Sequence, residues 1–287
     1  MEQINTVIDQ WHDRIGPLQQ KAVESRAAYL TAHQKIDSLR SPMPPQTGNV
    51  RRAAGYLRKA FGYAFRAPVL MYKQDSAKLD MQREQFKLDS FITETTSQLA
   101  AAIAPALKKS APETAVKIDA LQAALDAGLK ARKDSDYAVI SCAQAANNIQ
   151  WANNKYYFNA LQRCQNSARH VRDASESIKA FNGALGVAEA KSQFDDMSDI
   201  RFGKFGPEFS GDNNAKFSDA RRRLDAQRGA MSVCIDDLRT NLLDTIAAAA
   251  DTLGVKSKAL DSMIQAAQQR IRPVSATING AAPKADF

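Results

Sequence analysis

The fold is set by residues 2–39, EQINTVIDQWHDRIGPLQQKAVESRAAYLTAHQKIDSL, in which one series of positions recurs in alternating steps of four and three. The series is Ile4, Ile8, Trp11, Ile15, Leu18, Ala22, Ser25, Tyr29, Ala32, Ile36 and Leu39. This spacing places the mainly apolar side chains on one face of an α-helix, as in helices that pack side by side in coiled coils. Because proline cannot donate the helical hydrogen bond, we expect a kink at Gly16-Pro17. The stretch therefore predicts a long helix with one packing seam.

Three further stretches have helical spacing, over about residues 50–108, 111–185 and 217–271. No proline lies between Pro112 and Pro207, which suits long helices because proline in a helix interior costs about 3 kcal/mol. The predicted fold is all-α, an elongated bundle of long kinked helices with coiled-coil-like packing.

Local signals refine these boundaries. Pro68 is expected to kink or break its helix, and the charged run at 130–136 is expected to interrupt the next one. The sequence from Ser110 to Glu113 has the form of a capping box, in which the Ser110 hydroxyl would cap the helix that follows.

The chain is expected to form one domain followed by a tail. Residues 1–271 would make up a single elongated helical bundle, interrupted by an irregular, phenylalanine-rich loop over about 188–216. Residues 272–287 lose the helical period and contain two prolines, so we expect a disordered C-terminal tail.

Composition narrows the class of protein. The 287 residues carry a formal net charge of +8, which fits an anionic partner. Cys142, Cys164 and Cys234 have no metal-binding spacing, so we expect free, mostly buried thiols. The N-terminus does not resemble a signal peptide, and no run of about 18 apolar residues is present. We expect a cytoplasmic protein, or one exported by a route without a Sec signal peptide.

Residues 50–73 give the clearest indication of a partner. No acidic residue occurs between Asp37 and Asp75, and basic and apolar side chains of this stretch separate onto opposite faces of a helix. The predicted contact residues are Arg51, Arg52, Tyr56, Arg58, Lys59, Phe61, Tyr63, Arg66 and Lys73. They would contact another protein or an anionic membrane surface, and nucleic acid is a further candidate. The alternative is that the apolar face packs on neighbouring helices while the arginines pair with acidic residues or water.

Two other stretches are candidate sites. An amide-rich segment includes Asn147, Gln150 and Asn154, which we expect to form a polar network that fixes helix register. The same amides could instead line a polar groove. A second candidate is the loop tip.

The predicted loop tip consists of Phe202, Phe205 and Phe209. These side chains either dock on a partner or a membrane, or fold back and cap the end of the bundle. The nearby aspartates Asp195, Asp196 and Asp199 lack the spacing of a calcium loop, so no metal site is predicted.

No arrangement of residues indicates catalysis or a cofactor. His12, His33 and His170 have no ligand at metal-binding spacing, and nucleotide-binding and hydrolase motifs are missing from the sequence. The leading hypothesis is a non-enzymatic interaction or scaffold protein that uses the basic helix 50–73 to contact an anionic surface or an acidic partner. Self-association through the long helices is also expected. The alternatives are a secreted membrane-active effector or pore-forming toxin component, and a nucleic-acid-associated structural protein of the virion type.

Overall fold

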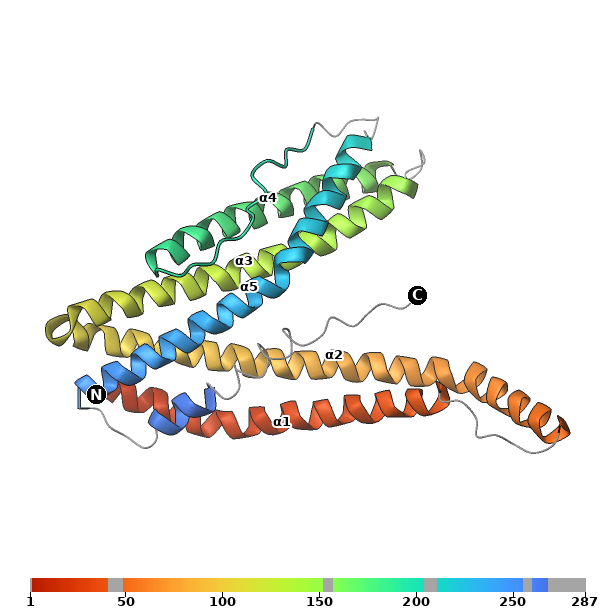
Figure 1. Ribbon diagram of the computed structural model, residues 1–287, viewed down its shortest axis with the longest axis horizontal. Helices are drawn as coiled ribbons and strands as arrows, with labels where there is room; N and C mark the ends of the chain where they lie inside the picture. Colours follow the sequence, from red (N-terminus) through yellow and green to blue (C-terminus); the bar gives the residue numbers. More distant parts are fainter. Residues whose placement is uncertain (1, 41–48, 152–156, 204–210, 255–259, 268–287) are drawn as a thin grey trace. The chain divides into compact units, whose positions relative to one another are not determined.

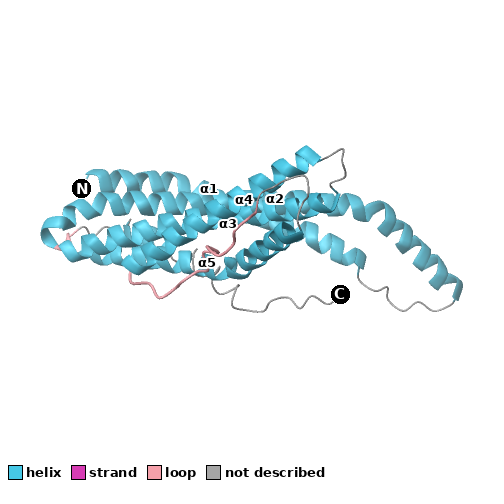
Figure 2. Ribbon diagram, turned by 90° about the horizontal axis from the view of Figure 1, so that it is seen from above, coloured by secondary structure: helices cyan, strands magenta, loops and turns pink. Residues whose placement is uncertain are grey.

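The computed structural model describes residues 2–40, 49–151, 157–203, 211–254 and 260–267. Within these ranges the side chains of a few helical segments are not described: residues 2, 39–40, 49–65, 67, 146–151, 157–159 and 211–212. The described residues form helices and connecting loops without any strand (Figure 2). The predicted all-α fold, with long helices packed side by side, is confirmed.

Five long helices carry most of the described chain (Figure 1). In chain order they are α1 (Glu2–Arg40), α2 (Asn49–Ser110), α3 (Pro112–Trp151), α4 (Tyr157–Val187) and α5 (Gly211–Thr252). Residues 260–267 are also helical. The chain divides into two compact units, one formed by Glu2–Thr96 and the other beginning at Ser97.

In the first unit, α1 and α2 lie antiparallel. The Arg14 guanidinium sits 4.8 Å above the ring of Phe91, and Gln74 bonds to the His33 ring at 2.8 Å. Every described position of the seam predicted in α1 is buried or half-buried, from Ile4 to Ile36. Helix α1 continues through Pro17, and α2 continues past Pro68. The four-three spacing therefore identified the face of α1 that packs on α2.

In the second unit, α3 packs against both α4 and α5, and each of these helices runs antiparallel to it. Ser167 on α4 donates a 2.7 Å hydrogen bond to the carbonyl of Ser141 on α3. On the α5 side, Arg228 pairs with Asp136 at 3.0 Å. Since α4 and α5 share α3 as an antiparallel neighbour, they run in the same direction.

Small side chains form the buried seam of α3. The buried positions along its middle and C-terminal half are Ala124, Leu125, Ala131, Ser135, Ala138, Cys142 and Ala145. At Gly128, a Cβ atom would lie 2.8 Å from Cε2 of Phe181 and 3.0 Å from Cγ1 of Ile235, so only glycine fits there. The small residues let three helices approach closely.

The expected interruption at 130–136 is wrong, because α3 runs through this segment without a break. Its charged residues lie at the rim of the seam, where Arg132 pairs with Asp136 at 3.3 Å and also bonds to Ser232. The helix instead ends at Trp151, and α4 begins at Tyr157. The predicted single helix over 111–185 is therefore two helices.

The predicted cap at Ser110 is also wrong. Its hydroxyl lies 3.5 Å from the Ala106 carbonyl of the preceding helix. The carbonyl of Ala111 accepts the first bond of α3, from the Ala115 N–H at 3.1 Å, so Ala111 occupies the N-cap position. Pro112 takes the first helical position, where no N–H is needed.

The C-terminal ends of α4 and α5 are each followed by a residue with a left-handed backbone conformation, but the residue type differs. Helix α4 closes with bonds from Glu189 N–H to the Gly186 carbonyl and from Ala190 N–H to the Leu185 carbonyl, a Schellman pattern. Its left-handed position is Glu189, with φ of 56°. Helix α5 ends at Thr252 and is followed by Gly254 with φ of 68°, so the predicted continuous helix over 217–271 is wrong. The predicted tail at 272–287 lies outside the described residues.

Candidate partner-binding surface on helix α2

The basic stretch predicted as a contact surface, residues 50–73, lies within α2. Its helical conformation agrees with the prediction. The side chains of Arg51, Arg52, Tyr56, Arg58, Lys59, Phe61 and Tyr63 lie outside the described part of the chain. Their role as contact residues stays a prediction.

Arg66 and Lys73, at the C-terminal end of this stretch, are described and exposed. Neither is in an ion pair with a described residue, and no acidic residue lies three or four positions from either in the sequence. Many arginines elsewhere do pair with aspartates: Arg83, Arg132, Arg169, Arg221, Arg222, Arg223, Arg228 and Arg239. The positive charge at this end of the stretch is therefore not compensated by neighbours that the structure describes.

An exposed apolar seam continues along α2 from the basic stretch. Tyr72, Leu79 and Phe86 are 75%, 66% and 72% exposed, and they recur every seven residues. Leu79 and Leu88 are nine positions apart, which is about half a turn round a helix. Leu88 is buried, and two residues of α2 that contact α1, Gln74 and Phe91, lie about 140° and 120° round the helix from Leu79. The seam thus lies on the outer face of α2, directed away from α1.

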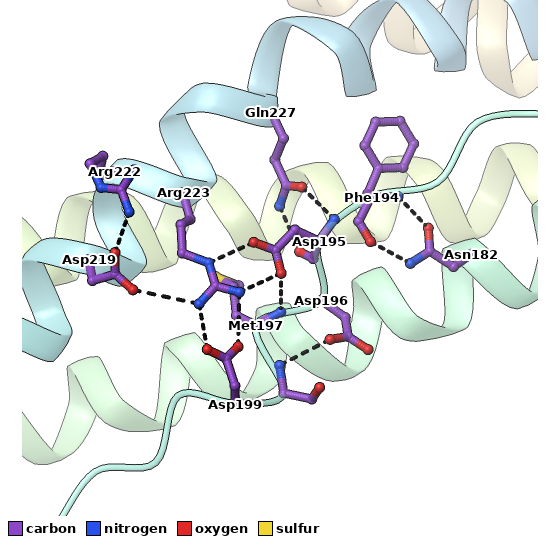
Figure 3. Close-up of polar contacts among 11 residues, drawn as sticks. Asn182, Phe194, Asp195, Asp196, Met197, Asp199, Asp219, Arg222, Arg223 and Gln227 are labelled. Carbon is purple, nitrogen blue, oxygen red and sulfur yellow. Dashed lines mark hydrogen bonds and ion pairs between the residues drawn. The ribbon is translucent and has the colours of Figure 1, made fainter.

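The phenylalanine-rich loop is anchored between α4 and α5. The ring of Phe194 is buried and stacks on Phe181 with centroids 5.4 Å apart. Asn182 holds the same residue by its backbone, accepting from its N–H at 2.9 Å and donating to its carbonyl at 2.7 Å (Figure 3). Further along, Phe202 is half-buried and stacks on Phe217 at 4.5 Å. Phe205 and Phe209 lie outside the described residues, so the predicted loop tip stays a prediction.

Arg223 on α5 fixes the acidic part of this loop. Its guanidinium donates two hydrogen bonds of 2.6 Å to Asp195 and two of 2.9 Å to Asp199 (Figure 3). Asp219, one turn earlier on α5, lies 3.5 Å away. Gln227 adds a pair of bonds to the Asp195 backbone, accepting at 2.9 Å and donating at 3.0 Å. This geometry is a paired-charge anchor.

The anchor shifts the titration of its carboxyl groups. Hydrogen bonds from the Arg223 guanidinium lower the pKa of Asp195 and of Asp199 below the ordinary value. Both groups are therefore ionised at neutral pH and committed to the arginine. In the described ranges, no group of three or more His, Cys, Asp or Glu side chains is placed to hold a metal ion.

Asn182, Arg223 and Gln227 were not predicted as site residues. A signal for one of them is present in the sequence, since the basic run at 221–223 and the aspartates at 195–199 have opposite charge. The predicted register network is not tested. Asn147 and Gln150 lie on α3 with undescribed side chains, and Asn154 lies outside the described residues.

The cysteines are free and buried, as predicted. Burial raises the pKa of Cys142 to about 12 and that of Cys164 to about 11, and it also raises the pKa of Cys234. These thiols are therefore protonated and weakly reactive in the folded chain.

Comparison with protein-family models, with curated proteins and with solved structures gave no match. A bilayer-crossing segment is not found among the described helices, none of which has a sufficiently long apolar run.

Proposed function

We propose that this protein is a non-enzymatic helical interaction protein that contacts an anionic surface or an acidic partner through residues 50–73 of α2. The observation that carries the proposal is the concentration of positive charge in a stretch with no acidic residue between Asp37 and Asp75. A concentrated positive face attracts anions over roughly a Debye length, about 8 Å at physiological salt.

Two features of the described residues support this assignment. Arg66 and Lys73 project from α2 as exposed cations without an ion-pair partner among described residues. In the alternative, the basic side chains pair with acidic neighbours, and residues 50–73 of α2 contain no carboxylate that could serve as such a neighbour. A basic side chain without a carboxylate partner keeps its positive charge uncompensated, so the stretch can attract an external anion.

The test is flotation of the purified chain with neutral and with anionic liposomes at moderate salt. We expect flotation with anionic vesicles only, and loss of flotation when Arg51, Arg52, Arg58 and Lys59 are changed together to glutamate. The matched control changes four exposed basic residues elsewhere to glutamate, namely Lys21, Arg26, Lys117 and Lys179. The control has the same net charge, so it separates a local site from the charge of the whole chain.

Other outcomes decide between the remaining partners. Absence of flotation with either vesicle excludes a lipid surface and leaves an acidic protein, to be captured with the same variant as a negative control. Leakage of vesicle contents would favour a membrane-active effector. DNA binding that falls steeply with salt would favour a nucleic-acid partner. If the fourfold variant does not fold, the residues are structural and the proposal loses its support.

A further inference from the structure

The exposed seam on α2 defines a second interaction surface, distinct from the basic stretch in chemistry. Tyr72, Leu79 and Phe86 lie within about 20° of one line along the outer face of the helix, because seven residues fall about 20° short of two turns. A helix with one apolar face toward α1 and another on the opposite side is typical of a helix that lies between two neighbours. The structure supplies a neighbour, α1, on one side within this unit.

We propose that the second neighbour is α2 of another copy of this chain, packed antiparallel across a twofold axis that passes beside Leu79. In this register a residue and its partner are equally far from position 79 in opposite directions. Leu79 meets Leu79 of the other copy, and Tyr72 meets Phe86 on each side. Each large apolar side chain of the seam is thereby covered by another.

The charges beside the seam fit the same register. Asp75 and Arg83 are each four residues from Leu79, so each aspartate meets the other copy's arginine. Both side chains are exposed, and Arg83 also pairs with Asp80 of its own helix at 2.9 Å. The twofold axis therefore gives two complementary pairings, one on each side of Leu79.

Other occupants of the seam fit less well. A parallel pairing in register would place Asp75 against Asp75 and Arg83 against Arg83, and like charges across such a contact are unfavourable. Beside the apolar line, Asp75 and Asp80 balance the charge of Lys78 and Arg83, so this face offers an anionic membrane no net positive charge. A second copy satisfies both the apolar and the charged positions.

The first experiment is sedimentation equilibrium of the full chain. We expect a monomer–dimer equilibrium for the wild type. In Leu79→Glu the dissociation constant should rise by roughly 100-fold, because two carboxylates would face each other in an apolar contact. The control is Val23→Glu on α1, which is 67% exposed in the wild type and off the seam, and which should dimerise like the wild type. A wild type that stays monomeric throughout the concentration series would overturn the proposal.

Charge exchange tests the pairing. Asp75→Arg and Arg83→Asp should each weaken the dimer, and the double variant should restore it, because the pair is regenerated with its signs reversed. Failure of the double variant to recover would overturn the register. Circular dichroism of each variant establishes that a weak dimer is not an unfolded chain.

Single cysteines test the direction. Leu79→Cys should form a disulfide-linked dimer on oxidation. Tyr72→Cys alone should not form one, because in an antiparallel pair position 72 of one copy lies 14 residues, or about 21 Å, along the helix axis from position 72 of the other. A mixture of Tyr72→Cys and Phe86→Cys should cross-link. Cross-linking of Tyr72→Cys with itself would show parallel pairing and overturn the proposal. The wild type, with its buried thiols, is the blank. These readouts are independent of liposome flotation, so either proposal can fail alone.

Discussion

Arg223 holds Asp195 through two parallel hydrogen bonds of 2.6 Å, the planar fork geometry in which arginine binds a carboxylate best. The arginine is on a regular helix and the aspartate is on a loop without regular structure. The pair therefore holds this part of the loop in a fixed position against α5.

Replacing this arginine should release the loop. In Arg223→Gln we expect trypsin to cut after Lys191 or Arg201, both exposed, roughly tenfold faster than in the wild type, because local opening becomes more frequent. The readout is the rate of appearance of the fragments by mass spectrometry. Arg222→Gln is the control, since Arg222 pairs with Asp219 of its own helix at 2.6 Å and not with the loop residues Asp195 and Asp199. Equal rates in the wild type and both variants would show that the anchor does not hold the loop.

The anchor should also weaken in acid. Asp195 and Asp199 have a lower pKa in the folded chain than the ordinary 3.8, so their pairing contributes stability that is fully present above that value. The contribution is lost as the pH falls through the lowered folded-state values. The measurement is the urea midpoint of the wild type and of Arg223→Gln as a function of pH. We expect the two midpoints to differ at pH 7 and the difference to shrink below about pH 3.8. A difference that does not change with pH would assign the effect to packing.

Gly128 should not tolerate even a methyl group. In Gly128→Ala the new Cβ would lie 2.8 Å from the buried ring of Phe181, which stacks on Phe194 and has little room to move. Overpacking costs about 1–3 kcal/mol, and the better helix propensity of alanine recovers about 1 kcal/mol. We expect a net loss of up to about 2 kcal/mol in the free energy of unfolding, measured in urea. Gly183→Ala on α4 has open space around it and should instead be slightly stabilising.

The end of α4 offers a stabilising substitution. Glu189 has a left-handed φ of 56°, where a side chain is strained and glycine is not. Glu189→Gly should raise the unfolding free energy by about 0.5–1 kcal/mol. Val187→Gly, two residues earlier and still helical, should lower it by roughly 0.3–0.5 kcal/mol, the difference between the helix propensities of the two residues. Thermal melts of both variants would contradict this account if the two substitutions acted in the same direction.

The buried thiols should report on unfolding. Because burial keeps the pKa of Cys142 at about 12 and that of Cys164 at about 11, few thiolates form at pH 8. Iodoacetamide should therefore label the native chain slowly, and all three cysteines should react fast once the chain is unfolded in urea. Fast labelling of the native chain would show that the helices around these thiols open readily.

Large apolar residues made much of the fold predictable. The predicted seam of α1 consists mainly of such residues at alternating spacing, and its described positions are buried or half-buried from Ile4 to Ile36. In α3 the large apolar Ile140 is exposed, whereas the smaller Ala138 and Cys142 are buried. Close helix packing favours small side chains, so residue size does not identify the buried face there.

The candidate site was less predictable for a different reason. Arg223 meets Asp195 and Asp199 only because the loop folds back along α5, and nothing local in either segment encodes that path. The outer seam at Tyr72, Leu79 and Phe86 is visible as a seven-residue spacing, but its exposure depends on which face of α2 receives α1. Contacts between segments far apart in the sequence therefore determine both the Arg223 anchor and the exposure of the outer seam, and local helix propensity does not.

The parallel course of α4 and α5 sets a minimum length for the chain between them. Helix α4 has 31 residues and spans about 46 Å, and the chain must return over most of that distance before α5 begins. An extended chain advances about 3.3 Å per residue, so a connection of fewer than about 14 residues would be too short. Residues 188–210 exceed this reach. A deletion that shortened them below it would force α5 to reverse direction or leave α3, so the span of this segment is a requirement of chain topology whatever its side chains bind.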